Sequence, residues 1–218
     1  MATLSDRAVA ELAEATRRLN SRSAPAHLPS LLASLSQLDG NPFSQEQIDA
    51  SIAAADVMCS PPEKRPAWPT AQGSRGLFFV FEGLDRSGKT TQSKLLAKHL
   101  ESSGSVKWMC FPNRQTPSGM LIDLYLRRMI ELPDETVHLL FSTNRWEASR
   151  MIVEEMNRGV HLVCDRYAFS GVAYSVAKGL DFSWCQEPDV GLPTPDSVFY
   201  IHVTPAVGAG RVNFGDER

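Results

Sequence analysis

The sequence predicts an α/β protein in which a parallel sheet is flanked by helices, with a helical extension at the N-terminus. After residue 75, apolar runs of strand length alternate with helical segments, and a glycine-rich pattern follows the first of these runs. Before residue 60, Ala, Ser, Leu and Gln dominate, and four prolines fall between residues 60 and 75. Alternating strands and helices are typical of a parallel sheet with helices on both faces. We therefore expect a helical extension over 1–59, a Pro-rich linker over 60–75 and an α/β domain over 76–218.

The extension contains three segments with helical periodicity. These segments span Ser5–Asn20, Leu28–Leu38 and Ser44–Met58. Ser44 with Gln47 forms the pattern of a capping box, which predicts the start of the third helix. No residue of the extension carries recognisable chemistry, so we expect it to pack on the main domain or on a partner.

The domain after residue 75 is expected to contain four strands and three helices. Parallel strands are buried on both faces, so they are expected as continuous apolar runs. The expected strands are Leu77–Glu82, Val106–Phe111, Val160–Cys164 and Ser197–Val203. The expected helices are Thr90–Ser102, Gly119–Glu131 and Asp134–Arg158, the last of them ended by Gly159.

Composition excludes several classes of ligand. The chain of 218 residues is 43% hydrophobic and 22% charged, which is ordinary for a globular domain. Its net charge of -3 provides neither a basic surface for nucleic acid nor a cationic face for a membrane. The longest apolar run, Leu77–Phe81, is far shorter than the roughly 20 residues of a transmembrane helix. We therefore expect no nucleic-acid partner and no membrane segment.

The cysteines and the N-terminus bear on the compartment. Four widely spaced cysteines without a CxxC pair predict reduced thiols rather than disulfides or a metal site. The first residues are rich in Ala, Ser and Arg, as transit peptides are, but Asp6, Glu11 and Glu14 argue against that interpretation. The sequence thus predicts a cytoplasmic protein without a clear targeting signal, with the nucleus or mitochondrion as alternatives.

A phosphate-binding loop follows the first predicted strand. The pattern Gly83-x4-Gly88-Lys89-Thr90 lies between that strand and the next helix, which is the context of a Walker A loop. Its glycines let the backbone wrap a phosphate closely, and the helix N-terminus favours negative charge. Lys89 would reach the β and γ phosphates, and the Thr90 hydroxyl would contact Mg2+. The domain is therefore predicted to be of the P-loop NTPase type and to bind ATP.

Charged residues follow two further predicted strands. Arg114 comes shortly after the second strand, and Asp165 and Arg166 directly follow the third. Ligands of parallel sheets gather at the carboxyl ends of strands, so these side chains are expected near Lys89. An acid there can hold a Mg2+-bound water and an arginine can clamp a phosphate, although Asp165 and Arg166 taken alone could form a plain ion pair.

One helix offers a candidate base-binding pair. Phe141 and Arg145 are four residues apart and share a helix face. An aromatic platform beside a planar donor would suit a nucleotide base. Spacing alone favours the simpler interpretation, in which Phe141 belongs to the core and Arg145 is a solvated or paired charge.

Five ordered motifs resemble the thymidylate kinase family, and closely resemble its eukaryotic type. They are "FEGLDRSGKTTQ", "FPNRQT", "LLFSTNRWE", "DRYAFSGVAYS" and "PDVGLPTPD". The similarity extends from about Gly76 to Arg218. The resemblance implies phosphorylation of dTMP to dTDP by ATP with Mg2+, and it implies a homodimer.

For the ATP side, the resemblance implies a site built from the loop and the third strand end. Thr90 and Asp165 would serve Mg2+, and Arg211 resembles the residue that stacks near the adenine. The residues implied to contact ATP are Gly83, Ser87, Gly88, Lys89, Thr90, Thr91 and Arg211.

For the acceptor, the resemblance implies contacts to phosphate, sugar and base. Asp85 resembles the residue that contacts the sugar 3'-hydroxyl, and Arg86 the loop arginine that bridges the two phosphates. Tyr174 matches an aromatic whose bulk disfavours a ribose 2'-hydroxyl. The acceptor set comprises Asp85, Phe111, the phosphate clamps Arg114 and Arg166, the stacking Phe141, the base donor Arg145, and Ser170, Gly171 and Tyr174 of the base pocket. The residues expected to act in catalysis are Asp85, Arg86, Lys89 and Arg166.

The sequence departs from the family pattern at two places. Asn113 stands where Glu is common, which matters little because Arg114 is kept. The stretch "PAVGAGRVNFGDER" aligns with the helix and lid that close over ATP, and the sequence ends inside that lid. We therefore expect a truncated domain, with Ser197–Val203 at an unprotected sheet edge, low stability and weak or absent activity.

Three functions remain open from the sequence. The first is a dTMP kinase, supported by the acceptor residues. The second is a catalytically silent nucleotide-binding module whose N-terminal helices recruit a partner, which the incomplete lid would favour. The third is a nucleoside monophosphate kinase for another base, against which Phe141 and Arg145 argue only through the resemblance.

Overall fold

A parallel four-stranded sheet forms the centre of the described structure. The computed structural model describes residues 5–17, 24–38, 40–68, 75–204 and 207. Its strands are β1 (Phe78–Gly83), β2 (Val106–Cys110), β3 (His161–Asp165) and β4 (Ser197–Ile201). They are all parallel and lie in the order β2-β3-β1-β4. The predicted α/β fold and the four predicted strands are confirmed.

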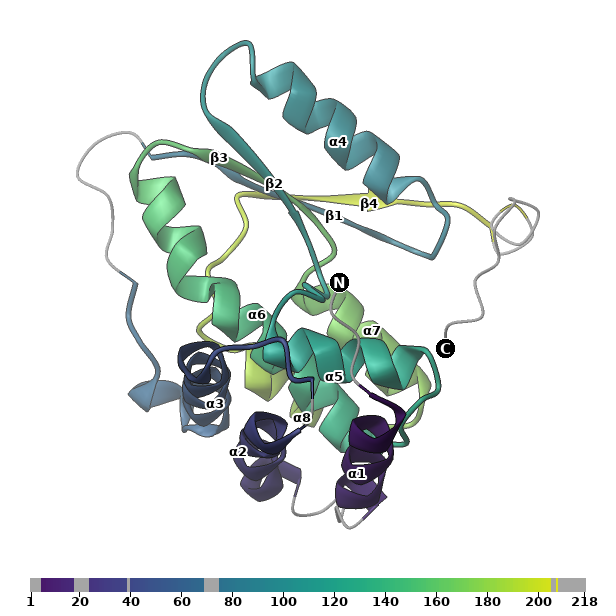
Figure 1. Ribbon diagram of the computed structural model, residues 1–218. Coiled ribbons are helices and arrows are strands. Elements are labelled where there is room, and N and C mark those ends of the chain that lie inside the picture. Colours follow the sequence, from purple (N-terminus) through teal and green to yellow (C-terminus); the bar gives the residue numbers. More distant parts are fainter. Residues whose placement is uncertain (1–4, 18–23, 39, 69–74, 205–206, 208–218) are drawn as a thin grey trace.

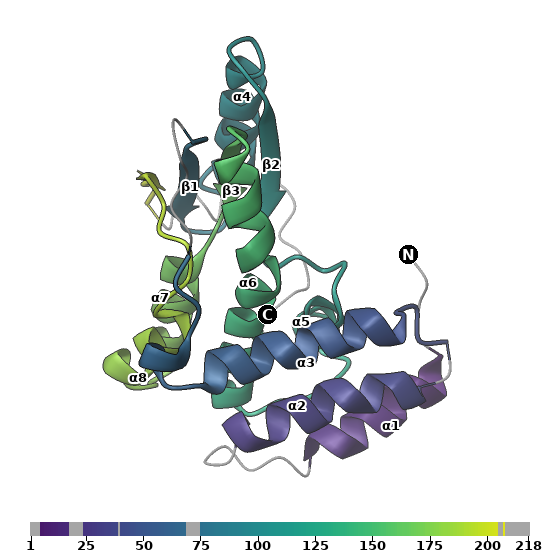
Figure 2. The same cartoon turned by 90° about the vertical axis from the view of Figure 1, so that its left-hand side faces the viewer.

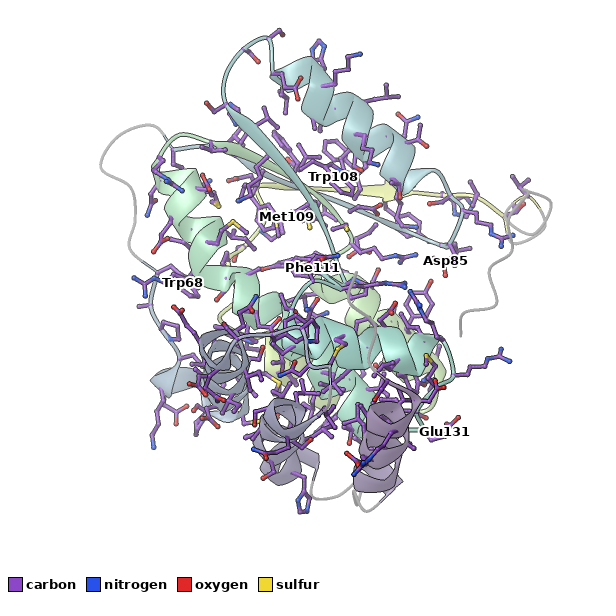
Figure 3. The ribbon with its side chains drawn as sticks, viewed as in Figure 1. Trp68, Asp85, Trp108, Met109, Phe111 and Glu131 are labelled. Carbon is purple, nitrogen blue, oxygen red and sulfur yellow. The ribbon has the colours of Figure 1, made fainter. Side chains whose placement is uncertain are left out.

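Helices cover both faces of this sheet. Helix α4 (Lys89–Leu100) lies on one face, and α6 (Asp134–Asn157) and α7 (Ala168–Ala177) lie on the other (Figure 1). The side chains of β2 point alternately to these two faces. Trp108 donates a hydrogen bond from Nε1 to Oγ of Ser93 on α4, at 3.0 Å, whereas Met109 packs into the core on the α6 side (Figure 3). Successive side chains of a strand point to opposite faces, so each layer has its own apolar contacts.

The N-terminal helices pack against the α6 side of the domain. These helices are α1 (Asp6–Arg17), α2 (Ala24–Ser34) and α3 (Gln45–Cys59). Figure 2 shows α2 and α3 layered against α5 (Pro117–Leu126) and α6. Buried leucines of α2 and buried residues of α3 belong to the same apolar cluster as Leu121 and Leu140 of the domain. The extension therefore packs on the main domain, which is the first of the two expected arrangements.

The capping box predicted at Ser44 is present and begins α3. The Ser44 side chain accepts a hydrogen bond from the Gln47 amide, and the Gln47 side chain accepts one from the Ser44 amide at 2.9 Å. We expect Ser44→Ala to lower the free energy of unfolding by about 1 kcal/mol, because one helix amide loses its acceptor. Urea denaturation of both proteins measures this difference. An unchanged midpoint and slope would contradict the prediction.

The C-terminal ends of α6 and α5 differ in whether the sequence indicates them. Helix α6 ends at Asn157, one residue before the predicted end, and Gly159 follows at φ +82° with its amide bonded to the Met156 carbonyl. Helix α5 was predicted to reach Glu131 but ends at Leu126. The same type of ending occurs there with Arg128 at φ +60°, and Met129 donates to the Leu124 carbonyl. That conformation favours glycine, so an arginine in its place gives no sequence signal.

The segment between β3 and β4 contains helices that the sequence analysis did not predict. They are α7 and the short α8 (Phe182–Gln186), followed by a 3₁₀ turn at Glu187–Asp189. Asp181 caps α8 by accepting from the Trp184 amide at 2.8 Å. Further 3₁₀ turns lie at Leu35–Gln37 and Pro62–Lys64. The 187–189 turn carries Asp189, which contacts Arg145 of the site described below, and α8 packs against α7.

Strand β4 lies at an edge of the sheet, as expected. It pairs with β1, and within the described residues no strand pairs with its other side. Phe199 stacks on Phe81 at 5.0 Å between ring centroids but remains 41% exposed, and Tyr200 is 65% exposed.

The four cysteines are free thiols, and Cys164 and Cys185 are buried. In the described ranges, no helix combines the length and apolar character needed to cross a bilayer.

Candidate active site

The loop after β1 has the backbone shape of a phosphate cradle. Gly83, Arg86 and Gly88 all have positive φ angles, of 142°, 61° and 101°. A Cβ atom at Gly83 would lie 2.4 Å from the Ile201 carbonyl oxygen of β4, so no other residue fits there. Helix α4 begins at Lys89, immediately after the loop. The N-terminal amides of this helix and its dipole therefore face the loop.

Lys89 is held inside the loop with little exposure to solvent. Its Nζ donates to the Leu84 carbonyl at 2.5 Å, and the residue is 5% exposed. Burial and the nearby charge of Arg166 lower the pKa of the Lys89 ammonium, while Asp165, Asp85 and Glu82 act in the opposite direction. A bound phosphate would supply the negative charge that this buried cation needs.

Thr90 and Asp165 together fit a magnesium ion. The Thr90 hydroxyl donates to Oδ2 of Asp165, which joins the start of α4 to the end of β3. Oδ1 of Asp165 is buried and has no hydrogen-bond partner. The described residues contain no cluster of three or more His, Cys, Asp or Glu side chains suited to a metal. A hydroxyl beside one carboxylate suits Mg2+, which takes one or two protein oxygens and completes its shell with phosphates and water.

Arg166 connects the phosphate loop to α7. Its guanidinium donates to the Ser170 hydroxyl at 2.9 Å and forms an ion pair with Asp85 of the loop. The Tyr174 hydroxyl donates to the other Asp85 oxygen at 2.9 Å, and the Arg166 guanidinium lies 5.5 Å from the Tyr174 ring centre. The structure therefore brings four predicted site residues from three elements into one cluster. Asp85 is visible at the loop in Figure 3.

Glu82 is a buried residue of this region that the sequence analysis did not select. Its side chain accepts from the amides of Tyr167 and Ser170 and from the Ser170 hydroxyl. Helix α7 has no side-chain cap of its own at Tyr167. Glu82 therefore satisfies amides at the start of α7 and fixes that helix beside the loop. The sequence feature that could have identified Glu82 is an acidic residue at the end of an otherwise apolar strand.

Arg145 is buried and paired with a second residue that was not predicted, Asp189. Its Nε and Nη2 donate to the two Asp189 oxygens at 3.0 and 2.7 Å, and Ser142 donates to the same carboxylate at 2.7 Å. The Arg145 side chain is only 2% exposed. A Cβ atom at Gly171 would lie 2.9 Å from Nη2 of Arg145, so glycine lets α7 approach the guanidinium.

Arg114 and the loop after β2 are held by α5 and α6. Nη1 of Arg114 donates to Asp123 of α5 at 2.6 Å. The buried Asn144 of α6 accepts from the Asn113 amide at 2.7 Å and donates to the Asn113 carbonyl at 3.0 Å. Asn113, the departure from the family pattern, thus takes part through its backbone. Neither Asp123 nor Asn144 was among the predicted site residues.

The other predicted site residues lie in separate places in the fold or outside the described residues. Phe111 is 5% exposed, lies between the sheet and α5 (Figure 3), and contacts the Tyr167 ring at 5.7 Å between centroids. Phe141 is half-buried and packs on the main apolar cluster. Ser87 is buried, and Thr91 is exposed on the first turn of α4. Arg211 lies outside the described residues.

Lys89 lies in the glycine-rich loop, Arg166 reaches that loop from the end of the third strand, and Asp165, an acid suited to Mg2+, lies beside the first helical threonine. This combination on a parallel sheet defines a P-loop phosphotransferase. The thymidylate kinase family model matches residues 81–218, and the chain belongs to that family.

Relatives and solved structures agree with this assignment. The chain is 50% identical over 146 residues to thymidylate kinase of Schizosaccharomyces pombe, covering 66% of this chain and 70% of that protein. It is 47% identical to the human thymidylate kinase over 146 residues, covering 66% and 69%. A thymidylate kinase structure from Candida albicans superposes with a TM-score of 0.62 at 37% identity, covering 67% of this chain and 72% of that one.

Proposed function

We propose that the protein transfers the γ-phosphate of ATP to dTMP, producing ADP and dTDP. Membership of the thymidylate kinase family supports both the reaction and the substrates. The observation that carries the proposal is the Asp85–Arg166 ion pair, because it joins the ATP-binding loop to the helix proposed to line the acceptor. The relatives and the solved structure compared above are named thymidylate kinases, and among the described residues no feature favours the silent binding module or a kinase for another base.

On the donor side, the loop residues would hold the ATP phosphates. The amides of the loop and of the α4 start would contact phosphate oxygens, and Lys89 would exchange the Leu84 carbonyl for the β and γ phosphates. Mg2+, held by Thr90 and Asp165, would neutralise charge on the phosphates. Arg211 is proposed to stack near the adenine by resemblance alone.

On the acceptor side, the clustered residues would contact each part of dTMP. Asp85 would accept from the sugar 3'-hydroxyl while Tyr174 limits space beside the sugar. Arg114 and Arg166 would clamp the phosphate. Each would give up part of its contact with the carboxylate that it now binds, Asp123 or Asp85. Phe141 would stack on the base, Arg145 would donate to a base carbonyl, and Ser170 and Gly171 would line the pocket.

The proposed chemistry needs positioning and charge neutralisation more than covalent help. Phosphoryl transfer joins two anions, so cations must hold them in line and offset their repulsion. Arg86 lies in the loop with a left-handed backbone conformation, at φ +61°, and by resemblance is proposed to contact the transferred phosphate. No nucleophilic side chain is required, because the acceptor phosphate oxygen attacks and ADP leaves.

The proposed function is tested by a coupled assay with ATP and Mg2+ across dTMP, dUMP, UMP, CMP and AMP. We expect turnover with dTMP to exceed turnover with the other acceptors. Arg166→Ala should lose at least a hundredfold in kcat/KM, as expected when a group that stabilises transition-state charge is removed. Tight ATP binding without turnover of any acceptor would instead support the binding module. Preference for another acceptor would support the third function.

Gly171→Ala tests the proposed base pocket. The added methyl group would lie 2.9 Å from Nη2 and 3.1 Å from Nη1 of Arg145, so the guanidinium or α7 must shift. We expect KM for dTMP to rise on the order of tenfold, because small displacements at a substrate contact are costly, while KM for ATP changes little. Steady-state kinetics measure both constants. Ala177→Ser, exposed at the end of the same helix, serves as the matched control.

Assembly and compartment remain predictions. The resemblance implies a homodimer, which sedimentation equilibrium of the purified chain would test. A cytoplasmic location rests on the free cysteines and on the acids within the first helix. Fluorescence microscopy of a C-terminally tagged chain would distinguish the cytoplasm from the nucleus and the mitochondrion.

A further inference from the structure

The segment after α3 is attached to the 187–191 turn through one arginine. Nη1 of Arg65 donates to the Glu187 and Val190 carbonyls, both at 2.6 Å. Its Nη2 donates to the Met58 carbonyl at 2.7 Å, and its Nε to the Ser60 carbonyl at 2.9 Å. One planar guanidinium thus joins the end of α3 to a turn more than 120 residues later in the chain. A lysine offers no such fixed fork of donors.

Two tryptophans reinforce this attachment. Trp68 donates from Nε1 to the Gly191 carbonyl at 2.6 Å, and its ring lies 6.3 Å from the Trp146 ring. Trp146 of α6 donates to the Pro188 carbonyl at 2.8 Å, and the Arg65 guanidinium lies 5.8 Å from its ring centre. Figure 3 shows Trp68 beside α6. The turn is therefore held from both sides, by α6 and by the segment after α3.

The turn carries the carboxylate that orients Arg145. Within the turn, Asp189 lies between Glu187 and Val190, whose carbonyls both accept hydrogen bonds from Arg65. Both Asp189 oxygens are engaged by Arg145, and one of them also accepts from Ser142. The position of the Arg145 guanidinium consequently depends on the position of this turn. Arg65 contributes to that position without touching Arg145.

We propose that Arg65 is a positioning residue for the acceptor base, acting through the 187–191 turn and Asp189 on Arg145. The segment after α3, which Arg65 joins to the end of that helix, would then be part of the substrate-site scaffold, although it lies outside residues 81–218 that match the family. This inference rests on the proposed function, in which Arg145 contacts the base. It concerns affinity for the acceptor, because the hydrogen bonds of Arg65 lead to the end of α3 and to the 187–191 turn.

The test compares Arg65→Ala and Arg65→Lys with wild type in the full chain. Steady-state kinetics give kcat and both KM values, and calorimetric titration gives the Kd for dTMP. For Arg65→Ala, we expect KM and Kd for dTMP to rise on the order of tenfold, with kcat and KM for ATP within about twofold. Arg65→Lys, which keeps the charge but not the fork, should fall between wild type and Arg65→Ala.

Two control variants separate positioning from a general loss of stability. Lys64→Ala removes an exposed charge next to Arg65 and should behave as wild type. Ser44→Ala weakens α3 at its far end and should lower stability without changing the Kd for dTMP. An equal rise in both KM values, or a matching rise in Kd with Ser44→Ala, would show that Arg65 is merely structural.

The outcomes also distinguish this inference from the proposed function. A wild-type chain that phosphorylates or binds dTMP, with the same Kd for Arg65→Ala, would overturn the inference alone. A wild-type chain that neither phosphorylates nor binds dTMP would overturn the proposed function, and this inference with it.

Discussion

Replacing Lys89 by methionine is expected to lower kcat/KM for phosphoryl transfer by about 10²–10³-fold, the usual cost of removing one charge-stabilising donor. Lys89 is 5% exposed at the start of α4, where its ammonium faces the centre of the phosphate loop. Methionine fills a similar volume without charge or donors. The transferring phosphate would lose a fixed cation that water cannot replace in this enclosed position. The coupled assay with ATP and dTMP measures the loss.

The fold should survive this replacement. Burial lowers the pKa of Lys89, which means that the surroundings already disfavour its charge in the free protein. A neutral side chain is therefore expected to leave the thermal unfolding midpoint equal to or slightly above that of wild type. Lys98→Met, on an exposed position of the same helix, should retain full activity. Activity of Lys89→Met within threefold of wild type would refute the assignment of this loop to phosphate binding.

The parts of the fold that the sequence predicted are those with local signals. Strand β1 is a continuous apolar run because both of its faces are covered, and Val80 and Phe81, which point to opposite faces, are 0% and 5% exposed. The capping box at Ser44 and the glycine after α6 also act within a few residues of where they lie. Helix α5 ends by the same hydrogen bonds with Arg128 in the glycine-favoring conformation. Tertiary packing overrode the local preference there.

In the candidate site, too, the features with local sequence signals were predicted and those that depend on distant residues were not. The loop was predicted because its glycines, lysine and threonine are adjacent in sequence and their spacing is set by phosphate geometry. Asp189 was missed because its partner Arg145 lies 44 residues away, and no short pattern encodes that separation. Glu82 was missed for a related reason, since it caps a helix that starts 86 residues later. Arg65 lay in a stretch whose prolines predicted only a linker.

The buried Arg145–Asp189 pair leads to the largest expected change in stability. Asp189→Ala should lower the free energy of unfolding by about 3–5 kcal/mol, because it leaves a buried guanidinium without its carboxylate. The two side chains are 2% and 7% exposed, so water cannot readily replace the lost partner. Ser142 also loses its acceptor. Urea denaturation followed by far-UV circular dichroism measures the change, with equal slopes required for the comparison.

A double replacement shows whether the cost arises from an unpaired charge or from lost packing. Arg145→Met with Asp189→Leu removes both charges and keeps most of the volume, and buried pairs replaced in this way are often neutral or stabilising. We therefore expect the double variant to be more stable than Asp189→Ala while dTMP binding is lost with the guanidinium. If Asp189→Ala changes the unfolding free energy by less than about 1 kcal/mol, then solvent reaches Arg145 in the native protein. The carboxylate would in that case orient the arginine for the base without holding the fold together.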